Sequence, residues 1–265
     1  MIRVQNLIKK FGDLAAVNDI SLDVAAGEIF AFLGPNGAGK TTTIKLLTTL
    51  LRPTSGSLEL DGIDPTIRPM EARKRFGIVF QDPSLDQELT ASENMDLHGV
   101  LYGVPRSIRV QRTGQLLKLF DLWDRRSSQV KTFSGGMKRR LEIARGLLHT
   151  PKILFLDEPT LGLDPQTRNQ LWAQIKHLNE TEHVTVFLTT HYMEEADSVA
   201  QQIAIIDHGR IVAEGTSQAL KQQTGTDTLE QAFLKLTGTA IRDEQGGGVD
   251  QMRAMAAMWR SKGRS

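Results

Sequence analysis

The sequence predicts an α/β protein in which helices cover a mainly parallel β-sheet. Three short apolar runs have the length and composition of buried strands: Ile153 to Leu156, Val184 to Leu188 and Ile203 to Ile206. Between the first two lies an apolar stripe at helical spacing that begins at Leu171. Alternation of strands and helices is typical of parallel sheets, because a crossover helix returns the chain to the same edge.

The N-terminal part adds the order strand, glycine loop, helix. Residues Ile2 to Leu7 and Ile20 to Val24 have β character, and the compact apolar run Ile29 to Leu33 is typical of a buried strand. A glycine-rich loop follows directly. Beyond it, apolar residues from Ile44 to Leu51 recur at spacings of three and four, which predicts a helix with one apolar face.

The amino-acid composition argues against several classes of protein. Of 265 residues, 40% are hydrophobic and 24% are charged, which argues against a disordered or membrane-embedded chain. The longest apolar run, Ala254 to Trp259, has six residues, whereas a membrane-spanning helix needs about 20. The net charge of +1 gives no global attraction to nucleic acid, and the absence of cysteine excludes disulfides and thiolate zinc sites. Since the N-terminus has no secretory signal pattern, we expect a cytosolic protein.

Changes in pattern along the chain suggest its domain organisation. Apolar residues at helical spacing around 116–123 predict a helical insertion at about 85–150. We expect one domain over residues 1–225, followed by a C-terminal helical extension and tail over 226–265.

The tail has its own pattern. Beyond a polar, glycine-rich link at Glu244 to Gly248, it places Met252, Met255 and Trp259 at helical spacing among basic residues. Two interpretations stay open: a segment that lies on a membrane surface or packs on a partner, or a packed or frayed terminus.

The glycine loop after the strand at Ile29 to Leu33 fits the pattern G-x-x-x-x-G-K-[ST] in full. Such a loop turns its backbone N–H groups toward phosphate oxygens at a helix N-terminus, while Lys40 supplies a cation and Thr41 a hydroxyl for Mg²⁺. A simple tight turn would require neither side chain. The sequence therefore predicts a nucleoside triphosphate site formed by Gly34, Asn36, Gly37, Ala38, Gly39, Lys40, Thr41 and Thr42.

Two adjacent carboxylates end the strand at Ile153 to Leu156. They would repel each other unless a cation lies nearby, so Asp157 is the candidate Mg²⁺ ligand and Glu158 is free to orient or deprotonate a water molecule. An ordinary solvated junction between strand and loop is the alternative.

A second candidate anion site lies at Ser134-Gly135-Gly136. Ser134 is a natural helix N-cap, and the two glycines leave the following N–H groups accessible to an anion. Alone, this segment would indicate only a capped helix.

Together these motifs make residues 2–215 similar to the ATP-binding subunit of an ATP-binding-cassette (ABC) transporter, closest to the ABC-2 or daunorubicin-resistance-type exporter ATPases. The glycine loop resembles Walker A, Gln81 the Q-loop, and residues 133–137, FSGGM, the family signature. Residues 153–159, ILFLDEP, resemble Walker B, Asp164 ends a D-loop, and His191 resembles the switch histidine. The resemblance implies a P-loop NTPase core with an N-terminal antiparallel β subdomain and a helical insertion subdomain.

The resemblance also implies partners and roles. Two subunits would form a head-to-tail homodimer, with each ATP between the Walker A loop of one and Ser134, Gly135 and Gly136 of the other. Phe11 would stack on adenine. Gln81 would contact Mg²⁺ or water, His191 would contact the γ-phosphate, and Asp164 would couple the two sites.

The implied setting is the cytoplasmic face of the cell membrane. There the subunit would energise export of a drug, glycan or lipid-like substrate through a separate transmembrane permease, with no nucleic acid as partner. The alternative is a soluble member of the superfamily with a nucleic-acid or regulatory role. The 94 residues from Lys40 to Ser134 are too few to hold the long coiled-coil arm of such ATPases.

Taken singly, the lesser motifs have plainer interpretations. Gln81 could be a polar loop residue, His191 a hydrogen-bonded structural residue, and Asp164 a helix N-cap before Pro165. The sequence also departs from the commonest family pattern, with Phe11 in place of tyrosine, Phe133 in place of leucine and Met137 in place of glutamine.

Overall fold

The computed structural model of the chain describes residues 1–238. The predicted link at 244–248 and the pattern at Met252, Met255 and Trp259 lie outside the described residues. No helix within residues 1–238 combines the length and the apolar character that a membrane crossing requires.

The predicted α/β fold is confirmed by a six-stranded central sheet. Its order is β5-β6-β7-β3-β8-β9, with five parallel strands and β9 antiparallel to β8. Every residue of β3, β6 and β7 is buried, and each strand contains an unbroken apolar run rather than an alternation of apolar and polar residues. The strands are β3 (Ile29–Leu33), β5 (Phe76–Val79), β6 (Ile153–Asp157), β7 (Thr185–Thr190), β8 (Gln202–Asp207) and β9 (Arg210–Gly215).

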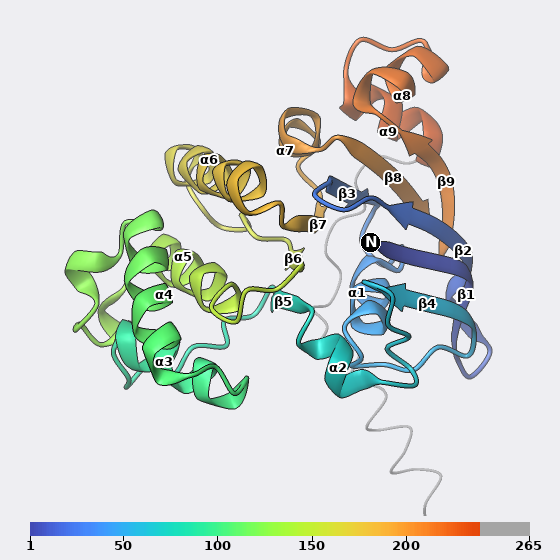
Figure 1. Cartoon of the computed structure of the whole chain (residues 1–265). Coiled ribbons are helices and arrows are strands. Elements are labelled where there is room, and N and C mark those ends of the chain that lie inside the picture. The colour runs from blue at the N-terminus through green and yellow to red at the C-terminus, as the bar shows by residue number, and fades with distance from the viewer. Residues whose placement is uncertain (239–265) are drawn as a thin grey trace, which may run out of the picture.

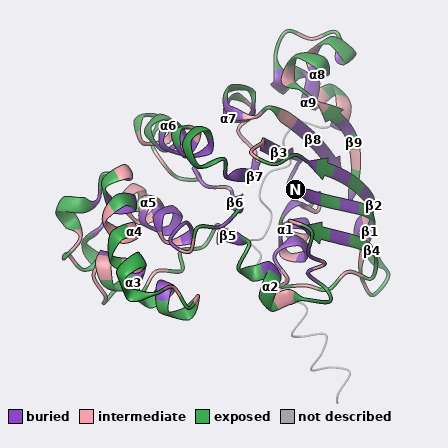
Figure 2. Cartoon of the chain, viewed as in Figure 1, coloured by how far each residue is buried: buried purple, intermediate pink, exposed green. Residues whose placement is uncertain are grey.

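The central sheet has a separate apolar core on each face (Figure 2). Phe30 and Phe32 of β3 face the first core, which holds α1 (Lys40–Leu47) and a second, smaller sheet. Ala31 and Leu33 face the other core, which four helices cover. These are α5 (Gly135–Gly146), α6 (Pro165–Glu182), α7 (Met193–Val199) and α9 (Leu229–Thr237).

The smaller sheet is the expected N-terminal antiparallel subdomain, with strand order β2-β1-β4. Ile2 pairs with Val24 on one side and with Leu60 on the other. β1 and β2 run further than the sequence predicts, because one side of each is solvated and their polar residues hide the pattern. The strands are β1 (Ile2–Phe11), β2 (Leu14–Val24) and β4 (Ser55–Leu60).

The expected helical insertion forms a lobe of α3, α4 and α5 beside the sheet (Figure 1). A capping box of Thr90 and Glu93 starts α3. The elements of this region before α5 are α3 (Ala91–Leu101), α4 (Arg106–Leu119), and the 3₁₀ turns η1 (Trp123–Arg125) and η2 (Val130–Thr132). The short helix α2 (Pro69–Arg73) precedes β5 and lies outside the lobe.

In two segments the structure adds to or differs from what the sequence predicts. The apolar stripe from Ile44 to Leu51 is not one helix, because α1 ends at Leu47 and Thr49 has φ of 65°. After β9, α8 (Ser217–Thr224) and α9 pack together, and Leu229 and Phe233 of α9 join the core beneath α7. The proposed domain boundary after residue 225 stays a prediction.

Candidate functional site

The glycine loop joins the end of β3 to the start of α1. Gly39 is the N-cap of α1, with φ of 112°, and a Cβ there would lie 2.5 Å from the carbonyl oxygen of Ala16. Glycine is therefore required at position 39 by both backbone conformation and space. In the described chain no side chain caps α1, so its first N–H groups suit an anion.

Lys40 is the first residue of α1, and its side chain reaches back into this loop. Its side chain is 6% exposed, and Nζ donates to the carbonyl oxygens of Gly34 (2.6 Å) and Pro35 (3.2 Å). Burial lowers the pKa of Lys40, and the negative charges of Glu158 and Asp157 oppose that shift. The loop thus holds a partly desolvated cation close to two carboxylates.

Asp157 is the last residue of β6 and is buried. Its Oδ1 accepts a hydrogen bond of 2.6 Å from the Thr189 hydroxyl of β7. Burial is the main cause that raises the pKa of Asp157, with a further contribution from Glu158 and opposition from Thr189 and Lys40. A carboxylate here, together with the Thr41 hydroxyl in the first turn of α1, supplies the oxygen donors that Mg²⁺ prefers.

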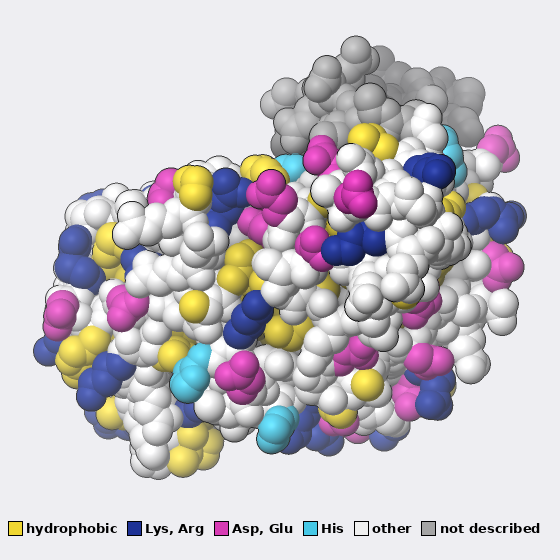
Figure 3. Space-filling model, turned by 90° about the horizontal axis from the view of Figure 1, so that it is seen from above, with side chains coloured by type: hydrophobic (Ala, Val, Ile, Leu, Met, Phe, Trp, Pro, Cys, Tyr) yellow, Lys and Arg dark blue, Asp and Glu magenta, His cyan; other side chains and the backbone are white. Residues whose placement is uncertain are grey.

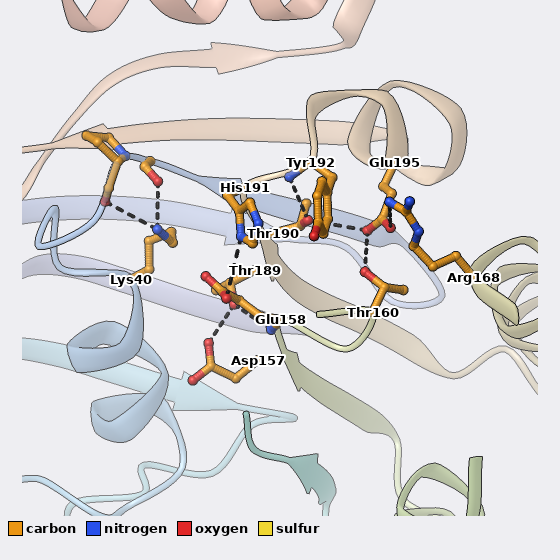
Figure 4. Close-up of polar contacts among 12 residues, drawn as sticks. Lys40, Asp157, Glu158, Thr160, Arg168, Thr189, Thr190, His191, Tyr192 and Glu195 are labelled. Carbon is orange, nitrogen blue, oxygen red and sulfur yellow. Dashed lines mark hydrogen bonds and ion pairs between the residues drawn. The ribbon is translucent and has the colours of Figure 1, made fainter. Parts of the chain in front are cut away.

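Glu158 leaves the strand in a left-handed conformation, with φ of 48°. Its N–H donates to the Thr189 carbonyl and hydroxyl oxygens at 3.1 Å, and its Oε2 lies 3.5 Å from His191 Nδ1 (Figure 4). Burial raises the pKa of Glu158, but His191, Lys40 and Arg139 together outweigh burial and lower it overall. Glu158 is therefore an ionised carboxylate oriented by a histidine, as a general base requires.

A second polar cluster lies beside His191 (Figure 4), and sequence analysis did not find it. The buried Glu195 carboxylate of α7 accepts hydrogen bonds from the hydroxyls of Thr160 (2.8 Å) and Thr190 (3.3 Å). Arg168 of α6 lies 3.7 Å from the same carboxylate and 4.8 Å over the Tyr192 ring. Nothing in the sequence distinguishes Glu195 from its exposed neighbour, so only the fold reveals its contacts.

The Ser134 segment starts α5. Ser134 is the N-cap and accepts a hydrogen bond of 3.3 Å from the Met137 N–H, as predicted. A Cβ on Gly136 would lie 2.8 Å from Thr167 Cγ2, so glycine permits α5 and α6 to approach closely. Gly135 has open space around its Cα. Phe133 is buried, with Arg125 5.6 Å over its ring.

Three other predicted residues belong to other elements than those that carry the Lys40 cluster. Phe11 ends β1, with Lys9 Nζ 5.0 Å from its ring centroid. Gln81 is exposed in the loop after β5. Asp164 is the N-cap of α6, where it accepts hydrogen bonds from the N–H (2.9 Å) and hydroxyl (2.6 Å) of Thr167, which confirms the capping interpretation. Its role in dimer coupling stays a prediction.

The comparisons with known proteins settle the family. Residues 17–161 match the ABC transporter family model, which is more than half of the chain. The chain belongs to the ABC transporter family.

Its relatives include ATP-binding proteins of named transport systems. It is 45% identical over 228 residues to a daunorubicin/doxorubicin resistance ATP-binding protein of Streptomyces peucetius, covering 86% of this chain and 69% of that protein. It is 42% identical over 231 residues to the Nod factor export ATP-binding protein I of Cupriavidus pinatubonensis, covering 87% of this chain and 71% of that protein.

Solved structures of ABC ATPases have the same fold as this chain. The ATP-binding subunit of an ABC transporter superposes with a TM-score of 0.81 at 30% identity, covering 89% of this chain and 99% of that one. A dimeric ATP-binding cassette in a post-hydrolysis state with ADP and Pi gives a TM-score of 0.72 at 29% identity, covering 82% and 98%. The chain is thus an ABC ATPase.

The arrangement follows from sheet topology. Lys40, Asp157, Glu158 and His191 follow the carboxyl ends of three neighbouring parallel strands, and such ends meet at one edge of a sheet. Ser134 belongs to the other layer, because α5 and α1 cover opposite faces of the central sheet.

Proposed function

We propose that this ATPase acts as a head-to-tail homodimer that powers export through a separate transmembrane permease at the cytoplasmic face of the membrane. The main support for this proposal is that α1 and α5 cover opposite faces of one sheet. The N-terminus of each of these helices suits an anion. If both helix ends bind one triphosphate, the second end has to come from another copy.

In this proposal the Walker A residues Gly34, Asn36, Gly37, Ala38, Gly39, Lys40, Thr41 and Thr42 bind the phosphates, and Phe11 stacks on adenine. Thr41 and Asp157, with Gln81, hold Mg²⁺, which neutralises charge on the phosphate oxygens when bound. Glu158 takes a proton from the attacking water, and His191 orients Glu158 and contacts the γ-phosphate. Ser134, Gly135 and Gly136 of the second copy contact the same ATP, and Asp164 couples the two sites.

The direction and cargo are proposed from the relatives. One is named for daunorubicin and doxorubicin resistance and another for Nod factor export. We infer that this chain serves export of a drug, glycan or lipid-like molecule. The alternative partner, nucleic acid, has less support: the net charge is +1, and charges of both signs are interspersed on the face in Figure 3.

The permease is proposed to dock on the helical lobe. Leu97, Val100 and Leu101 of α3 are exposed at helical spacing and so share one face. Nearby, a cavity of about 280 Å³ is lined by Tyr102, Ile108 and other residues of the lobe. Exposed apolar residues that gather in this way are typical of a protein interface.

Mixing two inactive variants tests the shared site. Ser134→Arg places a large side chain at the N-terminus of α5, where the second copy would contact ATP. Lys40→Ala removes a contact with the phosphates of ATP. A dimer with one copy of each regains one intact site, so an equal mixture is expected to recover up to about a quarter of wild-type hydrolysis. Mixtures that stay as inactive as the separate variants would contradict the head-to-tail proposal.

A further inference from the structure

Three charged side chains follow one face of α5 at intervals of three residues: Arg139, Glu142 and Arg145. Arg139 and Glu142 are only 7% and 3% exposed, and Nη1 of the arginine lies 3.2 Å from Oε2 of the glutamate. A buried ion pair is costly to desolvate unless further hydrogen bonds satisfy it. Its remaining contacts therefore indicate what the pair does.

Arg139 holds the backbone of the catalytic turn. Its Nη2 donates to the carbonyl oxygens of Glu158 (2.8 Å) and Asp157 (3.1 Å), and its Nε donates to that of Pro159 (2.7 Å). This is the turn in which Glu158 adopts a left-handed conformation that non-glycine residues seldom adopt. The planar guanidinium, with five N–H donors, can satisfy three successive carbonyls, whereas a lysine ammonium cannot match that geometry.

The same pair holds the loop that carries Gln81. Nη1 of Arg139 donates to the carbonyl oxygen of Phe80, immediately before Gln81. On the other side, Glu142 Oε1 accepts a hydrogen bond of 2.7 Å from the Ser84 N–H. Arg145 Nη1 donates to the Ser84 carbonyl oxygen at 2.8 Å. Both ends of the loop are thus fixed to α5.

We propose that Arg139 and Glu142 are positioning residues that fix the Glu158 turn and the Gln81 loop of their own chain to α5. The role deepens the proposed function and rests on it where the partner's nucleotide is concerned. Ser134 begins α5 and Arg139 follows five residues later, about 7 Å along the helix axis at 1.5 Å per residue. The helix that contacts one ATP therefore holds the catalytic groups that act on the other.

The first test compares neighbouring arginines in the unmixed protein. Arg139→Lys keeps the charge but loses the fork, so kcat for ATP hydrolysis is expected to fall about 10- to 100-fold, while the Kd for ATP stays within about twofold. Arg140→Lys is the matched control, because Arg140 on the same helix contacts the Phe120 carbonyl instead. Equal kcat in the two variants overturns the proposal, whether or not the dimer shares its sites.

A second variant tests whether a fall in kcat comes from lost positioning rather than from misfolding. Arg139→Met combined with Glu142→Leu replaces the buried pair by apolar side chains of similar volume, an exchange that folded proteins commonly tolerate. The double variant is expected to unfold near the wild-type temperature, to bind ATP, and to show the same fall in kcat. Wild-type kcat in this variant overturns the proposal.

The mixed dimer shows in which chain the pair acts. In the dimer with one intact site, Arg139→Lys is placed either in the Ser134→Arg chain, which supplies the working Lys40 and Glu158, or in the Lys40→Ala chain, which supplies only its signature. The first placement is expected to lower hydrolysis at least about tenfold and the second to leave it within about twofold. Equal losses, or a greater loss from the second placement, overturn the proposal. An inactive starting mixture counts against the shared site instead, and leaves the comparison of the unmixed arginine variants to decide.

Discussion

Asp157 and Glu158 are adjacent residues with different surroundings. Asp157 still belongs to β6 and is buried, with one oxygen bound to Thr189. Glu158 has turned out of the strand toward His191, and the surrounding positive charges lower its pKa. Burial favours the neutral acid and nearby cations favour the carboxylate, so the fold gives the two side chains different electrostatic surroundings. We propose that Asp157 binds a metal ion and that Glu158 accepts a proton.

Replacing Glu158 is expected to affect ATP hydrolysis but not ATP binding. Glu158→Gln keeps the volume and the hydrogen bonds of the turn but removes the basic oxygen, so hydrolysis is expected to slow by about 10² to 10⁴ while ATP still binds. Rates of phosphate release and the Kd for ATP measure the two effects. The exposed Glu194→Gln is the control and keeps wild-type turnover. Full turnover in Glu158→Gln would rule out the proton-transfer role.

How far the sequence predicted these residues depends on how local their contacts are. Lys40, Asp157 and Glu158 lie in short motifs whose chemistry is readable without the fold. Arg139 and Glu195 act through contacts with residues distant in sequence, such as Phe80 and Thr160. For Arg139 a signal did exist: charged residues recur every third position on a helix that also carries an apolar stripe. Charged helices on protein surfaces show the same pattern, so it could not be decisive.

At the scale of elements, the fully buried strands were the easiest to predict. β3 is apolar throughout, and β6 and β7 contain the apolar runs Ile153 to Leu156 and Val186 to Leu188, because both faces of these strands are covered. β4 and β5 were not predicted: the first begins Ser-Gly-Ser, and the second has only four residues, including Gly77. Their strand conformation comes from pairing with β1 and β6, which is tertiary information.

The contact between α3 and the end of α5 contains a stack of aromatic rings. Tyr102 stacks on His149 at 3.9 Å between centroids, with His98 4.5 Å from Tyr102. Burial lowers the pKa of His149 to about 4, and burial with the charges of Arg145 and His149 lowers that of His98 to about 3. Both rings are therefore neutral in the folded protein at neutral pH.

These shifts predict acid sensitivity. When the pKa of a histidine is lower in the folded protein than in the unfolded chain, the free energy of unfolding depends on pH. It is undiminished above the unfolded-state pKa of about 6.5, and it falls as the pH drops toward the folded-state pKa. By pH 5 the loss from His149 is on the order of 1–2 kcal/mol. We expect His149→Gln to flatten the fall in Tm between pH 7.5 and 5, while the exposed His177→Gln keeps the wild-type slope. Identical slopes in the two variants would contradict this account.

At the scale of the whole molecule, the three surfaces to which we assign functions lie on different parts of the structure. The proposed ATP site lies at the carboxyl ends of β3, β6 and β7, and the N-terminus of α5 lies in the layer across the sheet. The helical lobe lies beside the sheet (Figure 1), and Leu97, Val100 and Leu101 of its helix α3 are exposed. We therefore expect that ATP hydrolysis and the proposed docking on the permease can be changed separately.

A charge on α3 is expected to uncouple the ATPase from its membrane partner. Leu97, 48% exposed, lies on the apolar face of α3, whereas Val212, 40% exposed, lies on the edge strand β9 on the far side of the sheet. Burying a new carboxylate in an interface costs several kcal/mol, so Leu97→Glu should lower the fraction recovered with membranes of the cells that make the protein at least about tenfold. Val212→Glu should leave it unchanged, and neither variant should alter the ATPase rate of the isolated protein. Equal membrane recovery of the two variants would place the docking surface elsewhere, because an interface on this lobe could not accept the charge without loss of affinity.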